Sequence, residues 1–237
     1  MSDAQQSKQV HELRARGLAP KQIARSLGLL QAEVISLLNR TSERPAAAKQ
    51  SSHVRCWVSG GWAKELHVNG HDDWPGLDND SPVPGGLVCV LVARRHRHDN
   101  VSVCGYLIDV HCLGVKNALG PRLMDEVDMV AFRRWFFAGY GVEPVVAPLD
   151  LAQQLVFGAV DYASGLGFEP HADYANVVGH LGDPRGDCDI EFGRDGMPFF
   201  VQGPYDDARG IMQTLDASVG PDNYRFLITA PLHAIGA

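Results

Sequence analysis

Apolar residues between positions 6 and 40 recur every three or four residues, in three short runs separated by Gly17 and Gly28. This spacing places them on one face of a helix. Pro20 suits the first turn of the second run, and glycine suits the turn that ends a helix. The pattern predicts three short helices, with the apolar positions Val10 and Leu13, then Ile23, Ala24 and Leu27, then Val34, Ile35, Leu37 and Leu38.

The pattern changes after residue 40. Residues 41–52 are polar, rich in alanine and without periodicity, which is typical of a linker. Residues 53–237 then combine strand-like and helix-like runs. A strand is predicted over 54–58, and the Gly-, Pro- and Asp-rich stretch 69–86 predicts a long loop that carries Trp74. Apolar runs over 87–93 and 101–110, joined by the charged segment 94–100, predict an antiparallel hairpin.

Helical spacing returns further along the chain. It predicts helices over 122–138, 148–165 and 206–215, and a shorter one over 172–181. Residues 190–201 predict a second hairpin that turns at Asp195 and Gly196. The fold class expected is therefore α+β: a small all-α head over 6–40, a linker over 41–52, and a mixed α+β domain with antiparallel strands over 53–237.

Charge separates the two regions. The composition, 45% hydrophobic and 21% charged, is ordinary for a globular protein and excludes a mainly disordered chain. The first 50 residues hold eight Lys and Arg against four Asp and Glu, a net of +4, whereas the whole chain has a net charge of −7. The rest of the chain therefore carries −11. A polyanion would be attracted to the head and repelled by the body.

Neither the start of the chain nor its cysteines point to export. No basic segment followed by an apolar run opens the sequence, and no apolar run approaches the length of a membrane helix. The five cysteines are an odd number, widely spaced, without a C-x-x-C pair, which argues against a disulfide framework and a zinc ribbon. We expect a cytoplasmic protein with no membrane contact.

The segment Val10–Arg40, and above all Gln22-Ile-Ala-x-x-Leu-Gly28, resembles the trihelical helix-turn-helix domains of bacterial regulators and resolvases. In such domains the third helix enters the major groove of DNA, and neighbouring basic residues contact phosphates. The resemblance implies that Gln31, Ala32, Glu33 and Ser36 face the bases. It also implies phosphate contacts for Lys21, Arg25 and Arg40.

The body is faintly similar to uncharacterised bacterial proteins. Three parts of the sequence carry this similarity, namely Asp109-Val-His-Cys-Leu-Gly-Val-Lys-Asn-Ala118, Val156-Phe-Gly-Ala-Val-x-Tyr-Ala163 with Gly167-Phe-x-Pro-His171, and Gly203-Pro-Tyr-Asp206. It implies no activity. It favours one domain, rather than several, over residues 53 to about 220.

Polar residues that could carry chemistry gather at three places in the body. Asp109, His111 and Lys116 interrupt an apolar strand and its exit, and a carboxylate and an imidazole two residues apart suit an acid–base pair or metal ligation. His171 follows Pro170 near a predicted helix start. Asp189 stands in an alternating acidic row with Asp187 and Glu191. Catalytic candidates are thus Asp109, His111, Lys116 and His171, and metal candidates are Asp109, His171 and Asp189, whereas ordinary structural roles remain open for all of them.

These features support one leading hypothesis and two alternatives. The leading one is a DNA-binding protein of regulatory type, in which the head contacts DNA and the acidic body binds a ligand, a protein partner or a second copy. One alternative is a metal-dependent nuclease or related hydrolase, since clustered carboxylates can hold a divalent metal. The other is a protein-binding adaptor. No cofactor other than a possible divalent metal is expected, and no common nucleotide-binding, serine-hydrolase or zincin motif is present.

Overall fold

The computed structural model describes residues 20–27, 29, 54–77, 85–96, 100–183 and 186–228. The chain divides into two units, Met1–His53 and Val54–Ala237. In the first unit the described element is helix α2 (Pro20–Leu27). The strands of the second unit are β1 (Val54–Val58), β2 (His67–Val68), β3 (Leu87–Arg95), β4 (Asn100–Asp109), β5 (Gly114–Asp125), β6 (Val145–Ala147), β7 (Ile190–Glu191), β8 (Phe199–Val201) and β9 (Arg225–Leu227). Its helices are α5 (Glu126–Phe137), α6 (Leu149–Gly165), α7 (Tyr174–Val177) and α8 (Ala208–Ser218), with 3-10 turns at Ala138–Tyr140 and Val178–His180.

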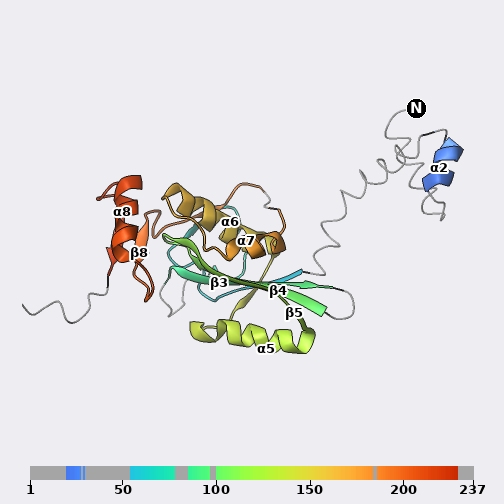
Figure 1. The fold of residues 1–237 in the computed structure, drawn as a ribbon, viewed down its shortest axis with the longest axis horizontal. Coiled ribbons are helices and arrows are strands. Elements are labelled where there is room, and N and C mark those ends of the chain that lie inside the picture. The colour runs from blue at the N-terminus through green and yellow to red at the C-terminus, as the bar shows by residue number, and fades with distance from the viewer. Residues whose placement is uncertain are drawn as a thin grey trace, which may run out of the picture. The chain divides into compact units, whose positions relative to one another are not determined.

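A five-stranded sheet is the centre of the described part of the body, with the strand order β5-β4-β3-β1-β6 and antiparallel pairing throughout. Helix α5 covers one face of this sheet, and α6 and α7 lie over the other (Figure 1). The mixed α+β class that the sequence predicts is therefore confirmed for the body.

Alternation along the central strands sends side chains to both helical layers. In β3, Val88, Val90 and Val92 pack under α6, while Cys89 and Leu91 face α5. Because every second residue of a strand points the same way, a continuous apolar run is what a strand covered on both faces requires. The run Leu87–Ala93 meets this requirement, and Val88 to Ala93 are all buried.

Helix α5 is fixed at its N-terminus by charged side chains. Asp125 caps it, since its carboxylate accepts a hydrogen bond from the backbone N–H of Asp128 at 2.8 Å. Glu126 in the first turn receives two hydrogen bonds from Arg55 of β1, at 2.7 and 2.9 Å. Both bonds come from the single nitrogen Nη2, and they link the first turn of α5 to β1.

The body has a third, smaller core at one end of the sheet. Buried Phe200, Leu215 and Tyr224 gather there from β8, α8 and the segment before β9, and Cys112 reaches it from the turn between β4 and β5. The strands β8 and β9 pair in parallel. This small core ties the C-terminal segment to the turn that follows β4.

Most elements predicted from the pattern are present. The strand over 54–58, the pairing of β3 with β4, the long α6 helix, the short helical segment around 174–180 and helix α8 are all confirmed. Much of the loop predicted over 69–86 is irregular where it is described, and residues 78–84 lie outside the described residues. The residues 97–99 of the predicted hairpin tip lie outside them as well.

Two predictions for the body are wrong in part. Residues 122–125 belong to β5 and not to a helix, so the helix begins at Glu126. The turn at Asp195 and Gly196 exists, with a bridge between Arg194 and Met197, but its flanking strands do not pair with each other. Instead β7 pairs with β2, and β8 pairs with β9. The Asp-Gly pair correctly predicts the position of the turn. The strands that β7 and β8 pair with depend on burial against distant segments, which the local sequence does not show.

In the head, helix α2 coincides with the second predicted helix. The first and third predicted helices and the linker over 41–52 lie outside the described residues. No helix in the described ranges is both long and apolar enough to cross a membrane.

Candidate functional site

Helix α2 is the described part of the proposed DNA-binding head. Ile23 and Ala24 are buried, with 0% and 6% of their surface exposed, and Arg25 is exposed. The backbone N–H of Leu29 donates to the carbonyl of Ala24 at 3.0 Å, a six-residue bond typical of a Schellman helix end. Of the DNA-binding candidates, Lys21 lies within α2 and Arg25 on its exposed side. Gln31, Ala32, Glu33, Ser36 and Arg40 lie outside the described residues.

In the body, Asp109 organises the turn that joins β4 to β5. Its Oδ1 accepts hydrogen bonds from the backbone N–H groups of His111 and Cys112, both at 3.0 Å. The residue is buried, and burial raises the pKa of its carboxyl group to about 6, although the two backbone hydrogen bonds and nearby Lys116 oppose this rise. Asp109 therefore holds the turn together while remaining able to bind a proton near neutral pH.

Lys116 belongs to an ion pair beside this turn. Its Nζ lies 2.9 and 2.6 Å from the two carboxylate oxygens of Asp206, and only 19% and 12% of the two side chains is exposed. Asp206 also accepts the backbone N–H of Gly203 at 2.8 Å. Lys116 and Asp206 therefore attach the segment before α8 to β5.

His111 is the most enclosed ionisable group of the three places singled out in the sequence. The residue is 1% exposed, and its Nε2 has no hydrogen-bond partner within the described part of the chain. The nearest carboxylate oxygen is Oε2 of Glu65, at 3.8 Å from Nε2. Burial lowers the pKa of His111, and the Glu65 carboxylate acts against that lowering. The imidazole is thus neutral at pH 7 and is aimed at a carboxylate beyond hydrogen-bond length.

Glu65 lies between this histidine and an arginine nearer the surface. Its Oε1 lies 2.8 Å from Nη2 of Arg194, so the two side chains form an ion pair at hydrogen-bond distance. The guanidinium of Arg194 also lies 4.9 Å from the centre of the Phe199 ring. The Glu65 carboxylate thus lies between the half-exposed guanidinium of Arg194 and the buried imidazole of His111.

The backbone is strained at the same place. Among the described residues, Glu65 and Asp195 are the two non-glycine residues with positive φ, at 67° and 53°. They are also joined to each other, because the N–H of Asp195 donates to the carbonyl of Glu65 at 3.3 Å. Left-handed backbone at a non-glycine residue costs free energy and is found preferentially at functional sites. The cluster of Glu65, His111 and Arg194 is therefore the body's best candidate site.

His171 lies elsewhere, in an exposed loop. Its Nδ1 accepts the backbone N–H of Asp173 at 3.2 Å and lies 3.6 Å from the Asp173 carboxylate. Its own backbone N–H donates to the carbonyl of Val115 in β5 at 2.9 Å. The residue shapes the entry to α7, and 41% of its side chain is exposed.

Asp189 forms a second polar cluster, on yet another surface. Its Oδ2 lies 2.9 Å from both Nε2 of His71 and Nε2 of Gln154, and these two contacts lower its pKa. The ring of His71 stacks on Trp74, with 4.0 Å between ring centres and an angle of 4°. An aspartate that orients a histidine resembles an acid–base pair, but here both side chains also serve to fix the loop before β3 against α6.

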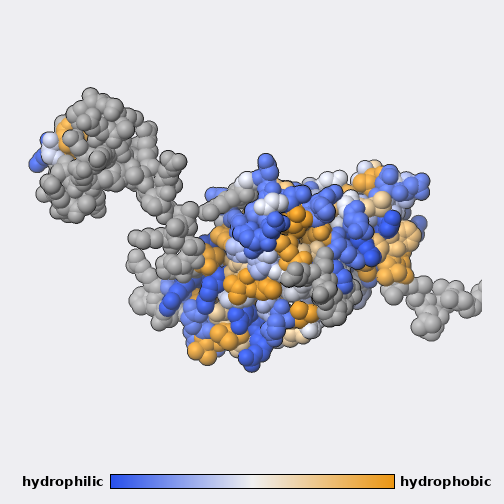
Figure 2. Space-filling model, turned by 180° about the vertical axis from the view of Figure 1, so that it is seen from behind, coloured by the Kyte–Doolittle hydropathy of each residue, from blue (hydrophilic) through white to orange (hydrophobic). Residues whose placement is uncertain are grey.

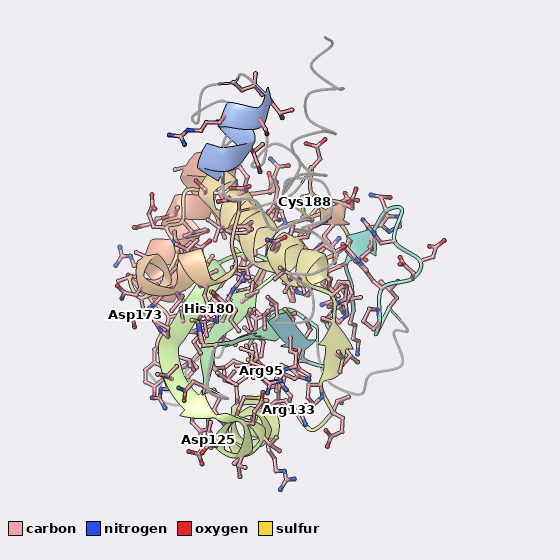
Figure 3. All side chains as sticks on the ribbon, turned by 90° about the vertical axis from the view of Figure 1, so that its right-hand side faces the viewer. Arg95, Asp125, Arg133, Asp173, His180 and Cys188 are labelled. Atoms are coloured by element: carbon pink, nitrogen blue, oxygen red, sulfur yellow. The ribbon has the colours of Figure 1, made fainter. Side chains whose placement is uncertain are left out.

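The structure thus brings some of the predicted candidates together and separates others. Asp109, His111 and Lys116 surround one turn, whereas His171 and Asp189 keep their own partners. Figure 3 labels their neighbours Asp173 and Cys188, which lie on different sides of α6. Within the described ranges, no three His, Cys, Asp or Glu side chains are grouped so that they could hold a metal ion. Glu65, His71 and Arg194 were not predicted as site residues, because no motif or periodicity in the sequence marks them.

The three sequence segments that carry the faint similarity of the body meet around β5. Gly114 packs so closely on α6 that a Cβ there would lie 2.7 Å from the Cβ of Ala163. His171 bonds to Val115, and Lys116 pairs with Asp206. At Gly114, Lys116 and Asp206 the packing therefore depends on the identity of the side chain, whereas His171 contributes a backbone hydrogen bond.

Comparison of the chain with protein-family models, curated proteins and solved structures finds no significant match.

Proposed function

We propose that the chain is a DNA-binding protein of regulatory type, whose head binds DNA in the manner of a helix-turn-helix domain. The observation that carries the proposal is α2, which begins at Pro20 and ends at Leu27 with Ile23 and Ala24 buried and Arg25 exposed. An amphipathic second helix with this division of residues is what the resemblance to trihelical DNA-binding domains implies.

The distribution of charge supports the same proposal. The first 50 residues carry +4 and the remainder −11. Basic side chains that neutralise phosphates supply affinity for DNA without regard to sequence, and acidic surface repels DNA. Contact through the head, with the body kept away from the duplex, is the arrangement that this division favours.

The geometry of the described part of the body does not favour the alternative of a nuclease centre. Two of the three metal candidates contact different side chains of the same chain: His171 lies beside Asp173, and Asp189 binds His71 and Gln154. The third, Asp109, accepts hydrogen bonds at Oδ1 from two backbone N–H groups of its own turn. A nuclease centre would need these carboxylates and imidazoles to converge on one metal or one phosphate.

An electrophoretic mobility shift at low salt tests the proposal. We expect the native chain to shift duplex DNA, and we expect the double variant Lys21→Glu/Arg25→Glu to lose that shift, because two phosphate-binding cations become anions. The matched control is Arg209→Glu/Arg225→Glu, which makes the same change of charge at two exposed body positions. It should bind nearly as well as the native chain. A native chain that does not shift DNA, or a head variant that shifts it unchanged, contradicts the proposal.

A further inference from the structure

A pocket lies between the end of α5 and the segment that leads to β6. It has a volume of about 480 Å³ and is lined by the last residues of α5 on one side and by residues 141–144 on the other. Helix α5 lies along the lower edge of the body in Figure 2, where hydrophobic and hydrophilic surface alternate. Pockets that hold small molecules commonly measure about 300 to 1,000 Å³, so this one has room for a small organic molecule.

Three charged side chains line the pocket, namely Arg133, Arg134 and Glu143. Among the residues that the structure describes, none of the three forms an ion pair with a protein group. The guanidinium of Arg133, which Figure 3 labels, lies 5.1 Å from the centre of the Trp57 ring in β1. A cation–π contact positions this guanidinium without a counter-ion. The pocket therefore offers two positive groups and one negative group that the described protein groups do not neutralise.

The rest of the wall is apolar and is held in place by the core. Phe137 is buried and Val142 is partly buried. The turn between them is attached to the sheet, because the thiol of Cys89 in β3 donates to the hydroxyl of Tyr140 at 3.1 Å. The segment after that turn packs tightly against Gly60, where an added Cβ would overlap with the side chain of Val142. The apolar wall is thus formed without a ligand.

The combination of charges indicates which chemistry the pocket can bind. A simple organic anion would be attracted by the two arginines but repelled by Glu143, and an organic cation would meet the opposite situation. A zwitterion satisfies both signs. A carboxylate matches the paired N–H groups of a guanidinium, and an ammonium group offers three donors to a carboxylate such as that of Glu143.

We propose that this pocket binds a free α-amino acid with a large apolar side chain. The carboxylate of the ligand pairs with Arg133 and Arg134, its ammonium group pairs with Glu143, and its side chain lies against Phe137 and Val142. The proposal goes beyond DNA binding and does not rest on it. Because Arg134 and Glu143 are exposed, their contacts with the ligand stay partly hydrated, and we expect a dissociation constant of roughly 0.1 to 1 mM.

Isothermal titration of the full chain without DNA tests the proposal, with L-phenylalanine, L-leucine and L-tryptophan as the probes. At least one of the three should bind with a dissociation constant below about 1 mM. The variants Arg134→Gln and Glu143→Gln should each weaken that binding about tenfold, since each removes one of the two charges that recognise a zwitterion. The matched controls are Arg209→Gln and Glu169→Gln, which make the same changes of charge at exposed positions outside the pocket. Both controls should bind like the native chain.

Two analogues of L-phenylalanine separate a zwitterion from the simpler ligands. Phenylpropanoate lacks the ammonium group and phenylethylamine lacks the carboxylate, so each should bind at least about tenfold more weakly than L-phenylalanine if that amino acid is bound. If L-leucine or L-tryptophan is the one that binds, its own deaminated and decarboxylated analogues serve in the same way.

Three results would overturn the proposal: no binding of any of the three amino acids below about 1 mM, unchanged binding in both pocket variants, or an analogue that binds as tightly as the amino acid itself. Circular dichroism of each variant separates a lost ligand contact from a lost fold. Because the titration contains no DNA, its outcome is independent of whether the head binds DNA.

Discussion

At the scale of single residues, Asp109 and His111 show how burial sets the chemistry of the body. Both belong to one turn, and burial acts on them in opposite directions, since it raises the pKa of Asp109 to about 6 and lowers that of His111. Each shift favours the neutral form. The turn therefore holds a proton-binding carboxyl and a proton-free imidazole two residues apart, which could not be deduced from their order in the sequence.

The sign of the Asp109 effect on stability follows from its pKa. Because the folded pKa of about 6 exceeds the unfolded value, the folded state binds the proton more tightly, and this contribution is present at low pH and is lost as the pH rises through 6. Asp109→Asn keeps an acceptor for the two N–H groups and removes the charge. The stability of the native chain relative to this variant should rise by about 1 kcal/mol from about pH 7.5 to pH 5. Urea unfolding at both pH values measures it, and a constant difference would contradict the assignment.

The ion pair between Lys116 and Asp206 is expected to be structural. Lys116→Met should destabilise the fold by about 2 kcal/mol, because it leaves a mostly buried carboxylate without its cation. Replacing both partners, in Lys116→Met/Asp206→Asn, should recover much of that loss, since no unpaired charge remains and the amide oxygen can still accept the backbone N–H of Gly203. Thermal unfolding measures the loss of stability in the single and the double variant. Equal destabilisation by the single and the double variant would argue against the pair as the cause.

At the scale of elements, the contact of β5 with α6 depends on Gly114. This residue has φ of +66°, and a Cβ would lie 2.7 Å from Ala163 Cβ and 2.8 Å from the carbonyl of Ala159. Gly114→Ala should therefore destabilise the fold by about 2 kcal/mol or more through clash and backbone strain. Gly165→Ala, at the end of α6 with no atom within 4 Å of the added Cβ, is the control and should be neutral or slightly stabilising. The midpoints of denaturant unfolding measure both effects. Equal shifts of the midpoint in Gly114→Ala and Gly165→Ala would contradict the close packing at Gly114.

The sequence predicts elements well where pattern and length agree. The apolar run 87–93 corresponds to a strand in which Val88 to Ala93 are buried, and the helical spacing of Leu151, Leu155 and Ala159 corresponds to the buried side of a helix. Prediction fails for β5, whose residues are partly exposed and whose pairing with β4 shifts register, so that no alternation shows. Strands such as β2 and β6 have two or three residues, too few for any pattern.

The candidate site was predicted only in part, for a related reason. Asp109, His111 and Lys116 are close in sequence and remain close in space, because a single turn joins β4 to β5. Glu65 and Arg194 reach the same place from distant segments, and only the tertiary structure brings them to His111. Their left-handed neighbour Asp195 could be anticipated from the Asp-Gly turn, but the strain at Glu65 could not.

At the scale of the whole molecule, we propose that DNA binds to the basic head and not to the acidic body. The salt dependence of DNA binding distinguishes the two regions. Fluorescence anisotropy of a labelled duplex should show affinity that falls steeply as salt rises, and the slope of log affinity against log salt should become shallower by about 2 in Lys21→Ala/Arg25→Ala. The Arg209→Ala/Arg225→Ala variant should keep the native slope. An unchanged slope in the head variant, or a shallower slope confined to the body variant, would show that DNA does not bind to the head.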